Sequence, residues 1–495
     1  SAPASWRSPI RTEEWKVPVA ELTTDKSVIS HKKSKRTISY GEVVKFAKVP
    51  AEPPKIAESE LKKPKDLKLI GRKDIKRVDV PSKVNGSARY GIDVQVPGMV
   101  YASLLHAPMD GVKVESVNAD DIKKIKGVTH VLSLPFGVAV VADTVEASRA
   151  GRLALKVKWD TTEAKAAPFD SEKAKEEYAR KAKDPASEVK EAFKVGDADK
   201  ALSGAAKTLE AAYWSEHTYH AQMEPMNAVA KVDGDQVEIW VGTQVQPLAS
   251  AVVANVLKTT PDKVKINLQL LGGGFGAKTY IKLEALVAAL SLIVKRPVKI
   301  AATMEEQSNI ITNHPATFRI KSAVDNDGKI LARKCEVFWN GGAYADIGPR
   351  VTQKSGLTAT GPYEIDNVAI DSYALYTNET PSGALRGFGV PQLVWAYESH
   401  TDIIARELKM DPVAFRRKNL LREGRPHATG TILKDAATEK VLDKLVERMN
   451  WSQPFDKGTG PVKKGRGLGI AIKAVITPTT SVAITNVSAD GSVTL

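Results

Sequence analysis

The residues best suited to chemistry in this chain form a glycine-rich run at positions 271–278, Leu-Gly-Gly-Gly-Phe-Gly-Ala-Lys. Apolar residues alternate from Val264 to Leu270 before it, which indicates a β-strand, and the apolar spacing from Leu283 to Leu290 predicts a helix after it. A strand, a glycine loop and a helix bring bare backbone N–H groups against an anionic ligand. The run therefore predicts an anion-binding loop.

A second run with similar chemistry lies at 384–392, Ala-Leu-Arg-Gly-Phe-Gly-Val-Pro-Gln. In both runs glycines flank a phenylalanine, Phe275 or Phe388, so the backbone can approach a ligand while the ring is displayed into a pocket. Arg386 adds a side chain that can bind an anion through two parallel hydrogen bonds. We expect the two loops to converge on one large anionic cofactor.

Two nucleotide-binding motifs are alternatives for the first run. The P-loop pattern needs glycine at Ala277, directly before Lys278 and Thr279, and no downstream strand ends in an aspartate suited to magnesium. The dinucleotide pattern is met by Gly272, Gly274 and Ala277, but the next predicted strand lacks an acidic residue at its tip. A P-loop-like nucleotide-binding protein stays open as an alternative.

His217, His220 and Glu224 are spaced closely enough to raise the question of a metal site. The segment around them lacks a helical pattern that would place all three on one face, so we expect structural histidines and assign no metal ligand. Cys335 is the single cysteine, and its apolar neighbours predict a buried thiol. One cysteine excludes an iron–sulfur cluster held by this chain alone.

The net charge of +14 does not by itself indicate nucleic-acid binding, because the densest lysine cluster, at 62–68, lies among prolines without aromatic residues and is typical of an extended linker. No apolar run approaches the ~20 residues of a membrane helix. We therefore expect no nucleic-acid partner and no membrane span.

The pattern of apolar runs predicts a mixed α+β fold in three parts. Residues 1–70 are rich in lysine and proline, show no core of their own, and are interpreted as the tail of a preceding domain plus a linker. Residues 71–165 are predicted to be a compact α+β domain, and residues 166–495 a large α/β domain. The chain begins with Ser1, and its last residues are interpreted as a hairpin cut in its second strand, with a turn at Asp490-Gly491. We expect it to be processed or incomplete at both ends.

Taken together, the two loops resemble the molybdopterin-binding large subunit of the molybdenum hydroxylases, the xanthine dehydrogenase/aldehyde oxidase family. Residues 80–160 are similar to the α/β-hammerhead domain of that family, and the extended N-terminal piece is closest to the isoquinoline 1-oxidoreductase β-subunit type. Further matching motifs are Thr243-Gln244, Met223-Glu224-Pro225, His314-Pro315, the segment 340–344 (Asn-Gly-Gly-Ala-Tyr) and the segment 96–99 (Val-Pro-Gly-Met). The resemblance implies an α/β-hammerhead domain followed by the first part of a molybdopterin-binding domain.

The resemblance also implies a function. It suggests hydroxylation of an N-heteroaromatic or aldehyde substrate with oxygen from water, using a molybdenum–molybdopterin cytosine dinucleotide cofactor. Electrons would pass to a partner, a small [2Fe-2S] subunit, with a flavin or cytochrome subunit as a further candidate. The implied substrate pocket contains Glu224, Phe275 and Phe388, and the implied cofactor-binding residues are Gln244, Gly274, Phe275, Gly276, Arg386, Gly387, Phe388 and Gly389.

The catalytic base of the family lies in a later segment, expected downstream of Leu495, so no catalytic residue is assigned and the chain alone is expected to be inactive. A non-catalytic scaffold subunit is a further alternative. Residence in the periplasm is expected, with the cytoplasm as the alternative. Two departures narrow the substrate: Thr279 stands where purine-oxidising members carry glutamate, and no cysteine lies near Arg386, as carbon-monoxide-oxidising members would require.

Overall fold

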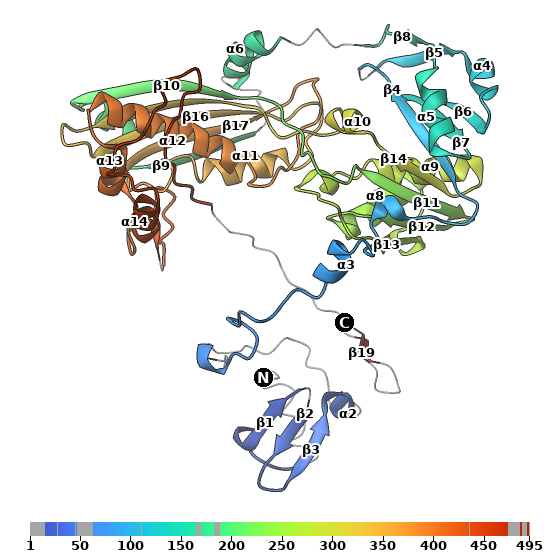
Figure 1. Cartoon of the computed structure of the whole chain (residues 1–495), viewed down its shortest axis with the longest axis horizontal. Helices are drawn as coiled ribbons and strands as arrows, with labels where there is room; N and C mark the ends of the chain where they lie inside the picture. The colour runs from blue at the N-terminus through green and yellow to red at the C-terminus, as the bar shows by residue number, and fades with distance from the viewer. Residues whose placement is uncertain are drawn as a thin grey trace. The chain divides into compact units, whose positions relative to one another are not determined.

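The contacts within the chain divide it into two units, Ser1–Ser87 with Ile476–Leu495, and Ala88–Val475. The computed structural model (Figure 1) describes residues 15–26, 28–44, 46, 63–109, 111–164, 170–182, 189–434, 436–473, 486–487 and 493–494. The predicted mixture of helices and sheets is confirmed. The first division lies after Ser87, whereas the sequence suggested one near residue 70.

The first unit contains a three-stranded antiparallel sheet of β1 (Leu22–Asp25), β2 (Val28–His31) and β3 (Arg36–Ser39), followed by α2 (Tyr40–Val44). Leu22, Ile29 and Val43 are buried together. The prediction that residues 1–70 lack a core is therefore wrong, because only three residues of this small cluster are fully buried and they leave little trace in the composition. Strands β18 (Asn486–Val487) and β19 (Val493–Thr494) pair antiparallel, as the hairpin prediction requires, and its turn lies outside the described residues.

The second unit contains a seven-stranded sheet with the order β13-β12-β11-β14-β4-β7-β6. Its strands are β4 (Val100–His106), β6 (Val128–Leu134), β7 (Gly137–Ala142), β11 (Asn227–Asp233), β12 (Gln236–Val241), β13 (Val264–Leu268) and β14 (Val298–Ala301). Strand β4 pairs parallel with β14, so segments from the predicted hammerhead and cofactor-binding domains share one sheet. The domain boundary at residue 165 stays a prediction.

Helices α5 (Val145–Leu153), α8 (Gln246–Leu257) and α9 (Leu283–Val294) pack on this sheet. Apolar residues of α9 recur every three or four positions and are buried against β11 and β14, which explains why this segment is helical. The strand and the helix predicted around the first glycine-rich run are thus confirmed. Helix α4 (Ala119–Lys123) packs on the edge strand β6, and outside the sheet β5 (Lys113–Val117) pairs with β8 (Val157–Asp160).

A five-stranded sheet with the order β10-β15-β16-β17-β9 forms the other half of the second unit. Its strands are β9 (Val189–Val195), β10 (Lys207–Ser215), β15 (Ala316–Val324), β16 (Ile330–Asn340) and β17 (Asn367–Leu375). Side chains alternate along β16, so Val337 and Trp339 join the main core while Phe338 faces a separate cluster. The sheet is therefore covered on both faces.

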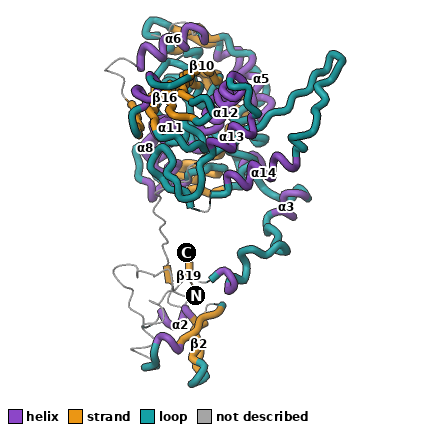
Figure 2. Tube along the Cα trace, turned by 90° about the vertical axis from the view of Figure 1, so that its left-hand side faces the viewer, coloured by secondary structure: helices purple, strands orange, loops and turns teal. Residues whose placement is uncertain are grey.

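Helices α11 (Gly348–Gly356), α12 (Val390–Glu407) and α13 (Pro412–Asn419) cover the face of Trp339, and Figures 1 and 2 both show α11 and α12 beside β16. Helices α6 (Ser171–Ala182) and α7 (Ala198–Ser203) lie on the other face. Helix α14 (Thr438–Arg448) packs on α13. Helix α12 begins within the second glycine-rich run, at Val390, so the fold places the glycines of that run at a helix N-terminus.

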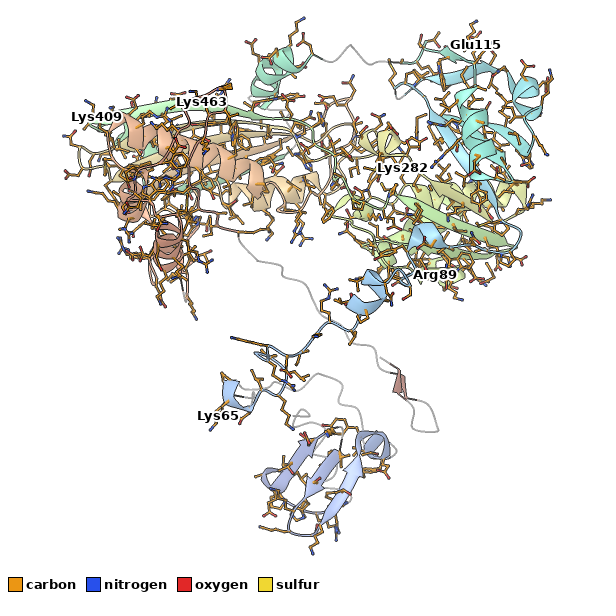
Figure 3. All side chains as sticks on the ribbon, viewed as in Figure 1. Lys65, Arg89, Glu115, Lys282, Lys409 and Lys463 are labelled. Carbon is orange, nitrogen blue, oxygen red and sulfur yellow. The ribbon has the colours of Figure 1, made fainter. Side chains whose placement is uncertain are left out.

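The surface of the second unit carries charged side chains at widely separated places. Glu115 and Lys409 are exposed and lie toward opposite ends of this unit (Figure 3). Among the residues described, no helix has both the length and the apolar character needed to cross a bilayer.

Candidate functional site: two joined glycine loops

Residues 271–279, between β13 and α9, form what we call the first glycine loop. Its backbone takes positive φ at Gly273 (101°), Phe275 (52°) and Gly276 (113°). Glycine adopts such angles without strain, whereas Phe275 does so only where its surroundings hold it. The loop is therefore a tight structure that displays the Phe275 side chain, 41% of which is exposed.

Glu224 stabilises the first glycine loop through hydrogen bonds to two of its residues, Gly272 and Lys278. Its Oε2 accepts hydrogen bonds from the Gly272 N–H (2.8 Å) and the Lys278 ammonium (2.5 Å), and its Oε1 accepts from the Ile92 N–H (3.0 Å) and Asn227 Nδ2 (3.1 Å). The side chains of Glu224 and Lys278 are only 5% and 4% exposed. Burial raises the pKa of Glu224, but the bonds from Lys278 and Gly272 outweigh it, so its pKa lies below the ordinary value.

This arrangement corrects one sequence prediction. Glu224 was expected to line a substrate pocket, but it is 6% exposed and both of its oxygens are bonded within the chain. The same arrangement argues against a P-loop, in which the lysine ammonium must reach a phosphate. Here the ammonium of Lys278 is held by a buried carboxylate. The sequence missed this pair because its two members lie on different segments.

Gln244, which lies three residues after the end of β12, supports the first glycine loop. Its Oε1 accepts from the Gly276 N–H at 2.9 Å, and its backbone N–H donates to the Lys278 carbonyl at 2.9 Å. Because the Gly276 N–H needs an acceptor, the amide oxygen must face the loop, which turns Nε2 outward as a donor. Gln244 is exposed, so this nitrogen can donate to a ligand placed over the loop.

Residues 384–389, before α12, form the second glycine loop, and it is joined directly to the first. The Arg386 N–H donates to the Phe275 carbonyl at 2.8 Å. A Cβ at Gly276 would lie 1.7 Å from the Ala384 carbonyl oxygen, so only glycine allows this approach. His220 Nε2 bonds the same carbonyl at 2.7 Å. The expected convergence of the two loops is confirmed.

The side chains of the second glycine loop face different surroundings. Phe388 has positive φ (62°) and is half-buried, while the guanidinium of Arg386 is exposed. A Cβ at Gly387 would come within 2.5 Å of the Pro391 ring, which explains the glycine there. The structure therefore places all predicted cofactor-binding residues on, or bonded to, two loops in mutual contact.

The joined loops present unpaired backbone donors. Within the described chain, the N–H groups of Gly273, Gly274, Phe275, Gly387 and Gly389 have no hydrogen-bond acceptor. The last two lie at the N-terminus of the 18-residue helix α12, where the helix dipole favours negative charge. Such a cradle of donors fits an anionic, phosphate-bearing cofactor.

Comparison with known proteins supports the assignment of a cofactor-binding site to these loops. Residues 181–420, which contain both loops, match the family model described as the molybdopterin cofactor-binding domain. This part of the chain is a molybdopterin cofactor-binding domain. The resemblance drawn from the two loops is thereby confirmed, and the nucleotide-binding alternative is disfavoured.

Proteins similar to most of the chain include a molybdopterin subunit, in agreement with the domain match. The chain is 32% identical over 463 residues to isoquinoline 1-oxidoreductase subunit beta of Brevundimonas diminuta, covering 82% of this chain and 57% of that protein. It is 29% identical over 426 residues to the nicotinate dehydrogenase large molybdopterin subunit of Eubacterium barkeri, covering 79% of this chain and 99% of that protein. The chain thus spans little more than half of the first relative.

A solved structure shares the fold. The aldehyde oxidoreductase from Desulfovibrio gigas superposes with a TM-score of 0.65 at 22% identity, over 76% of this chain and 46% of that chain. At this identity the likeness concerns the fold alone.

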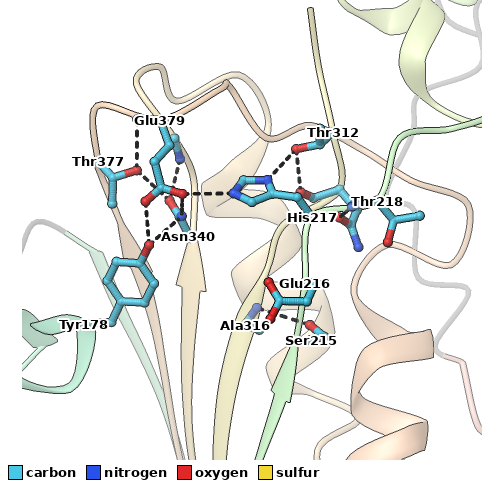
Figure 4. A network of polar contacts seen from close by, with 12 residues as sticks. Tyr178, Ser215, Glu216, His217, Thr218, Thr312, Ala316, Asn340, Thr377 and Glu379 are labelled. Carbon is cyan, nitrogen blue, oxygen red and sulfur yellow. Dashed lines mark hydrogen bonds and ion pairs between the residues drawn. The ribbon is translucent and has the colours of Figure 1, made fainter. Parts of the chain in front are cut away.

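A polar network holds the segment that precedes the second glycine loop of the molybdopterin cofactor-binding domain (Figure 4). The Glu379 carboxylate accepts from Tyr178 Oη (2.5 Å) and Asn340 Nδ2 (2.9 Å), and it bonds His217 Nε2 (2.9 Å), whose Nδ1 bonds Thr312 Oγ1 (2.8 Å). The Thr312 backbone in turn bonds the carbonyl of Pro381 and the N–H of Gly383, which precede the loop. No motif in the sequence signalled this network.

His217, His220 and Glu224 thus bind three different partners: Glu379, the Ala384 carbonyl and Lys278. Among the described residues, no group of three histidine, cysteine, aspartate or glutamate side chains is arranged to hold a metal ion. The two histidines act as hydrogen-bonding groups of the fold, as the sequence suggested.

A cavity of about 470 Å³ lies in the same unit, within the size range of small-molecule sites. Residues that follow the first loop (Tyr280, Lys282), residues that precede the second (379–381) and the end of β4 line it. Burial, together with the charges of Lys282 and Arg152, lowers the pKa of His106 in this cavity to about 4, so its ring is neutral at pH 7.

Two further sequence predictions concern Thr279 and Cys335. The Thr279 hydroxyl donates to the Gly276 carbonyl at 2.6 Å, so it closes the first glycine loop. Cys335 is 2% exposed, which confirms the prediction of a buried thiol, and burial raises its pKa to about 12.

Proposed function

We propose that this chain is the molybdenum-cofactor subunit of an oxidoreductase that hydroxylates an N-heteroaromatic or aldehyde substrate with oxygen from water. The observation that carries the proposal is the joined pair of glycine loops, with unpaired backbone donors and the outward amide of Gln244. Isoquinoline and nicotinate, in the names of two relatives, are N-heteroaromatic compounds, which supports that substrate class.

Residues of both loops would hold the cofactor. The N–H groups of Gly274 and Phe275 and those of Gly387 and Gly389 would bind its anionic groups, and Gln244 Nε2 would donate to an oxygen beside the metal. When bound, the cofactor supplies two-electron redox chemistry and Lewis acidity. We further propose the cytosine dinucleotide form.

The rings of Phe275 and Phe388 would contact a planar substrate through their faces and edges. The Thr279 hydroxyl is occupied within the loop, so no side chain at this position is available to orient a purine. This favours heteroarenes with fewer polar groups, or aldehydes, over xanthine.

Electrons must leave through a partner, and we propose a small [2Fe-2S] subunit, with a flavin or cytochrome subunit as an additional component. The single cysteine of the sequence supports this, since a [2Fe-2S] cluster needs four protein ligands. The catalytic base is proposed to lie outside the given sequence. Residence in the periplasm is proposed, with the cytoplasm as the alternative.

The test is to purify the full-length protein with its partner subunits and measure molybdenum, the nucleotide released by acid hydrolysis, and reduction of a dye acceptor by N-heteroarenes and aldehydes. Molybdenum with stoichiometric cytidine monophosphate and substrate-dependent dye reduction is expected. Bound molybdenum without turnover of either substrate class would support the scaffold alternative. Absence of molybdenum, with a thermal shift caused by ATP or GTP, would overturn the proposal in favour of a nucleotide-binding protein.

A matched pair of variants tests Gln244 in the same complex. Gln244→Glu keeps an acceptor for the Gly276 N–H but removes the outward donor, whereas Gln244→Ala removes both. We expect both variants to lose turnover and only Gln244→Ala to lose thermal stability as well. Full turnover in Gln244→Glu would exclude a role for the amide nitrogen.

A further inference from the structure

Glu284 is a buried carboxyl group beneath the first glycine loop to which the proposed function assigns no role. It is the second residue of α9 and is 5% exposed. Its Oε2 has no hydrogen-bond partner among the described residues. A buried carboxylate oxygen without a partner is costly, so Oε2 must either bind a proton or meet a buried water molecule.

A small cavity beside Glu284 provides room for such a water molecule. It measures about 10 Å³, close to the space that one water molecule occupies, and Glu284, Asn227 and Lys278 are among the residues that line it. Asn227 Oδ1 is a second buried oxygen without a partner in the described chain. A water molecule here could join Glu284 to Asn227, whose amide nitrogen donates to Glu224.

Lys278 interacts with Glu224 and lines the same small cavity as Glu284. It is bonded to Glu224 at 2.5 Å, and it is also the charged side chain whose field acts on Glu284. Burial is the main effect on Glu284 and raises its pKa to about 7. Hydrogen bonds from the backbone N–H groups of Glu284 and Lys282, and then the charge of Lys278, only partly offset it. Near neutral pH, Glu284 therefore exchanges a proton while Glu224 stays ionised.

We propose that Glu284 is a positioning residue whose neutral carboxyl keeps the first glycine loop closed: when it loses its proton, it draws the Lys278 ammonium away from Glu224 and so loosens the Gly272 anchor. The proton passes to solvent, and no other bond forms or breaks covalently. The consequence for cofactor binding rests on the proposed function, whereas the effect on the loop does not.

The sign of the pH dependence follows from the raised pKa. The folded state holds the proton of Glu284 up to about pH 7, whereas an ordinary glutamate releases it near 4.5. Stability from this group is therefore complete below about pH 4.5, is lost as the pH rises toward 7, and does not change further above 7. Each pH unit in this window lowers the folding equilibrium constant about tenfold.

The test uses Glu284→Gln in the full-length complex, because glutamine resembles a neutral glutamate and does not titrate. Glu439→Gln is the matched control, since Glu439 also lies in the first turn of a helix, α14, but is exposed. Two measurements are made for each protein, the melting temperature from pH 5 to 8.5 and hydrogen exchange of a peptide spanning residues 269–283, corrected for intrinsic rates. If Glu284→Gln does not fold, the infrared carbonyl band of a protonated carboxylic acid is followed in the wild type.

We expect the melting temperature of Glu284→Gln to rise relative to the wild type between pH 5 and 7, and that of Glu439→Gln to follow the wild type. Exchange in the peptide should become faster in the wild type above pH 7 and stay constant in Glu284→Gln. Equal pH dependence of wild type and Glu284→Gln, or an infrared band already absent at pH 5.5, would overturn the proposal. Hydrogen exchange of the 269–283 peptide that is the same in the wild type and in Glu284→Gln at every pH would also overturn it. A complex that lacks molybdenum at every pH contradicts the proposed function and leaves both readouts interpretable.

Discussion

Replacement of Lys278 by methionine tests whether the buried ion pair holds the first glycine loop. Methionine keeps an unbranched chain of similar length but removes the ammonium, so Glu224 stays charged in a site that is 5% exposed. Removing one partner of a buried pair typically costs about 3–5 kcal/mol. Because Glu224 keeps three donors, from Gly272, Ile92 and Asn227, we expect the lower end, about 3 kcal/mol.

The cost should depend on pH in a defined direction. The Lys278 bond helps to hold the pKa of Glu224 below its ordinary value, so loss of Lys278 raises that pKa. Near pH 5 the variant can then relieve the cost by binding a proton at Glu224, whereas at pH 8 it cannot. The loss of stability should therefore be larger at pH 8 than at pH 5.

The assay is denaturant unfolding of wild type and variant at both pH values, followed by tryptophan fluorescence. Lys265→Met is the control, because Lys265 pairs with Glu238 at 3.4 Å on the surface and is 69% exposed. Such a pair contributes about 0–1 kcal/mol. The reasoning is refuted if Lys278→Met and Lys265→Met cost the same, or if the cost of Lys278→Met does not change with pH.

Three further predictions concern the contact between the two glycine loops, the buried thiol and the polar network. Gly276→Ala should lower the free energy of unfolding by more than about 3 kcal/mol, because the new Cβ would lie 1.7 Å from the Ala384 oxygen. Gly234→Ala is the control: Gly234 has open space around it, so the substitution should cost only about 1–2 kcal/mol for the positive φ. Calorimetric melting of both variants checks the difference. The Cys335 thiol should react with Ellman's reagent only after denaturation, given its burial and raised pKa, and rapid labelling of the native protein would contradict the structure. Tyr178→Phe should destabilise the polar network by about 1–3 kcal/mol, since the half-buried carboxylate of Glu379 and the buried amide of Asn340 each lose a partner. Unchanged urea unfolding would show that this network contributes nothing to stability.

The elements around the site could largely be predicted from sequence, because their patterns are local. The alternation before the first glycine loop predicted β13, and the apolar spacing after it predicted α9. The small core of the first unit escaped prediction, since three buried residues leave no periodic trace.

Roles that depend on a distant partner could not be predicted in this way. The family resemblance placed Glu224 in a substrate pocket, and nothing in its motif indicated that Lys278, 54 residues later, pairs with its charge. The sequence analysis did not single out Glu284, which stands in the first turn of a helix, where acidic side chains are common. Only packing showed that α9 buries it, and burial is what changes its protonation.

The sequence by itself determined where the backbone can bend and approach a ligand, since the absence of a Cβ at Gly273 and Gly276 is a local property that no distant residue can supply. Tertiary structure decided which groups these bends would meet. The bond from the Arg386 N–H to the Phe275 carbonyl and the ion pair of Glu224 with Lys278 join segments on different elements. Hydrogen bonds and buried charges depend on distances of a few ångströms between such segments, and those distances exist only in the folded chain.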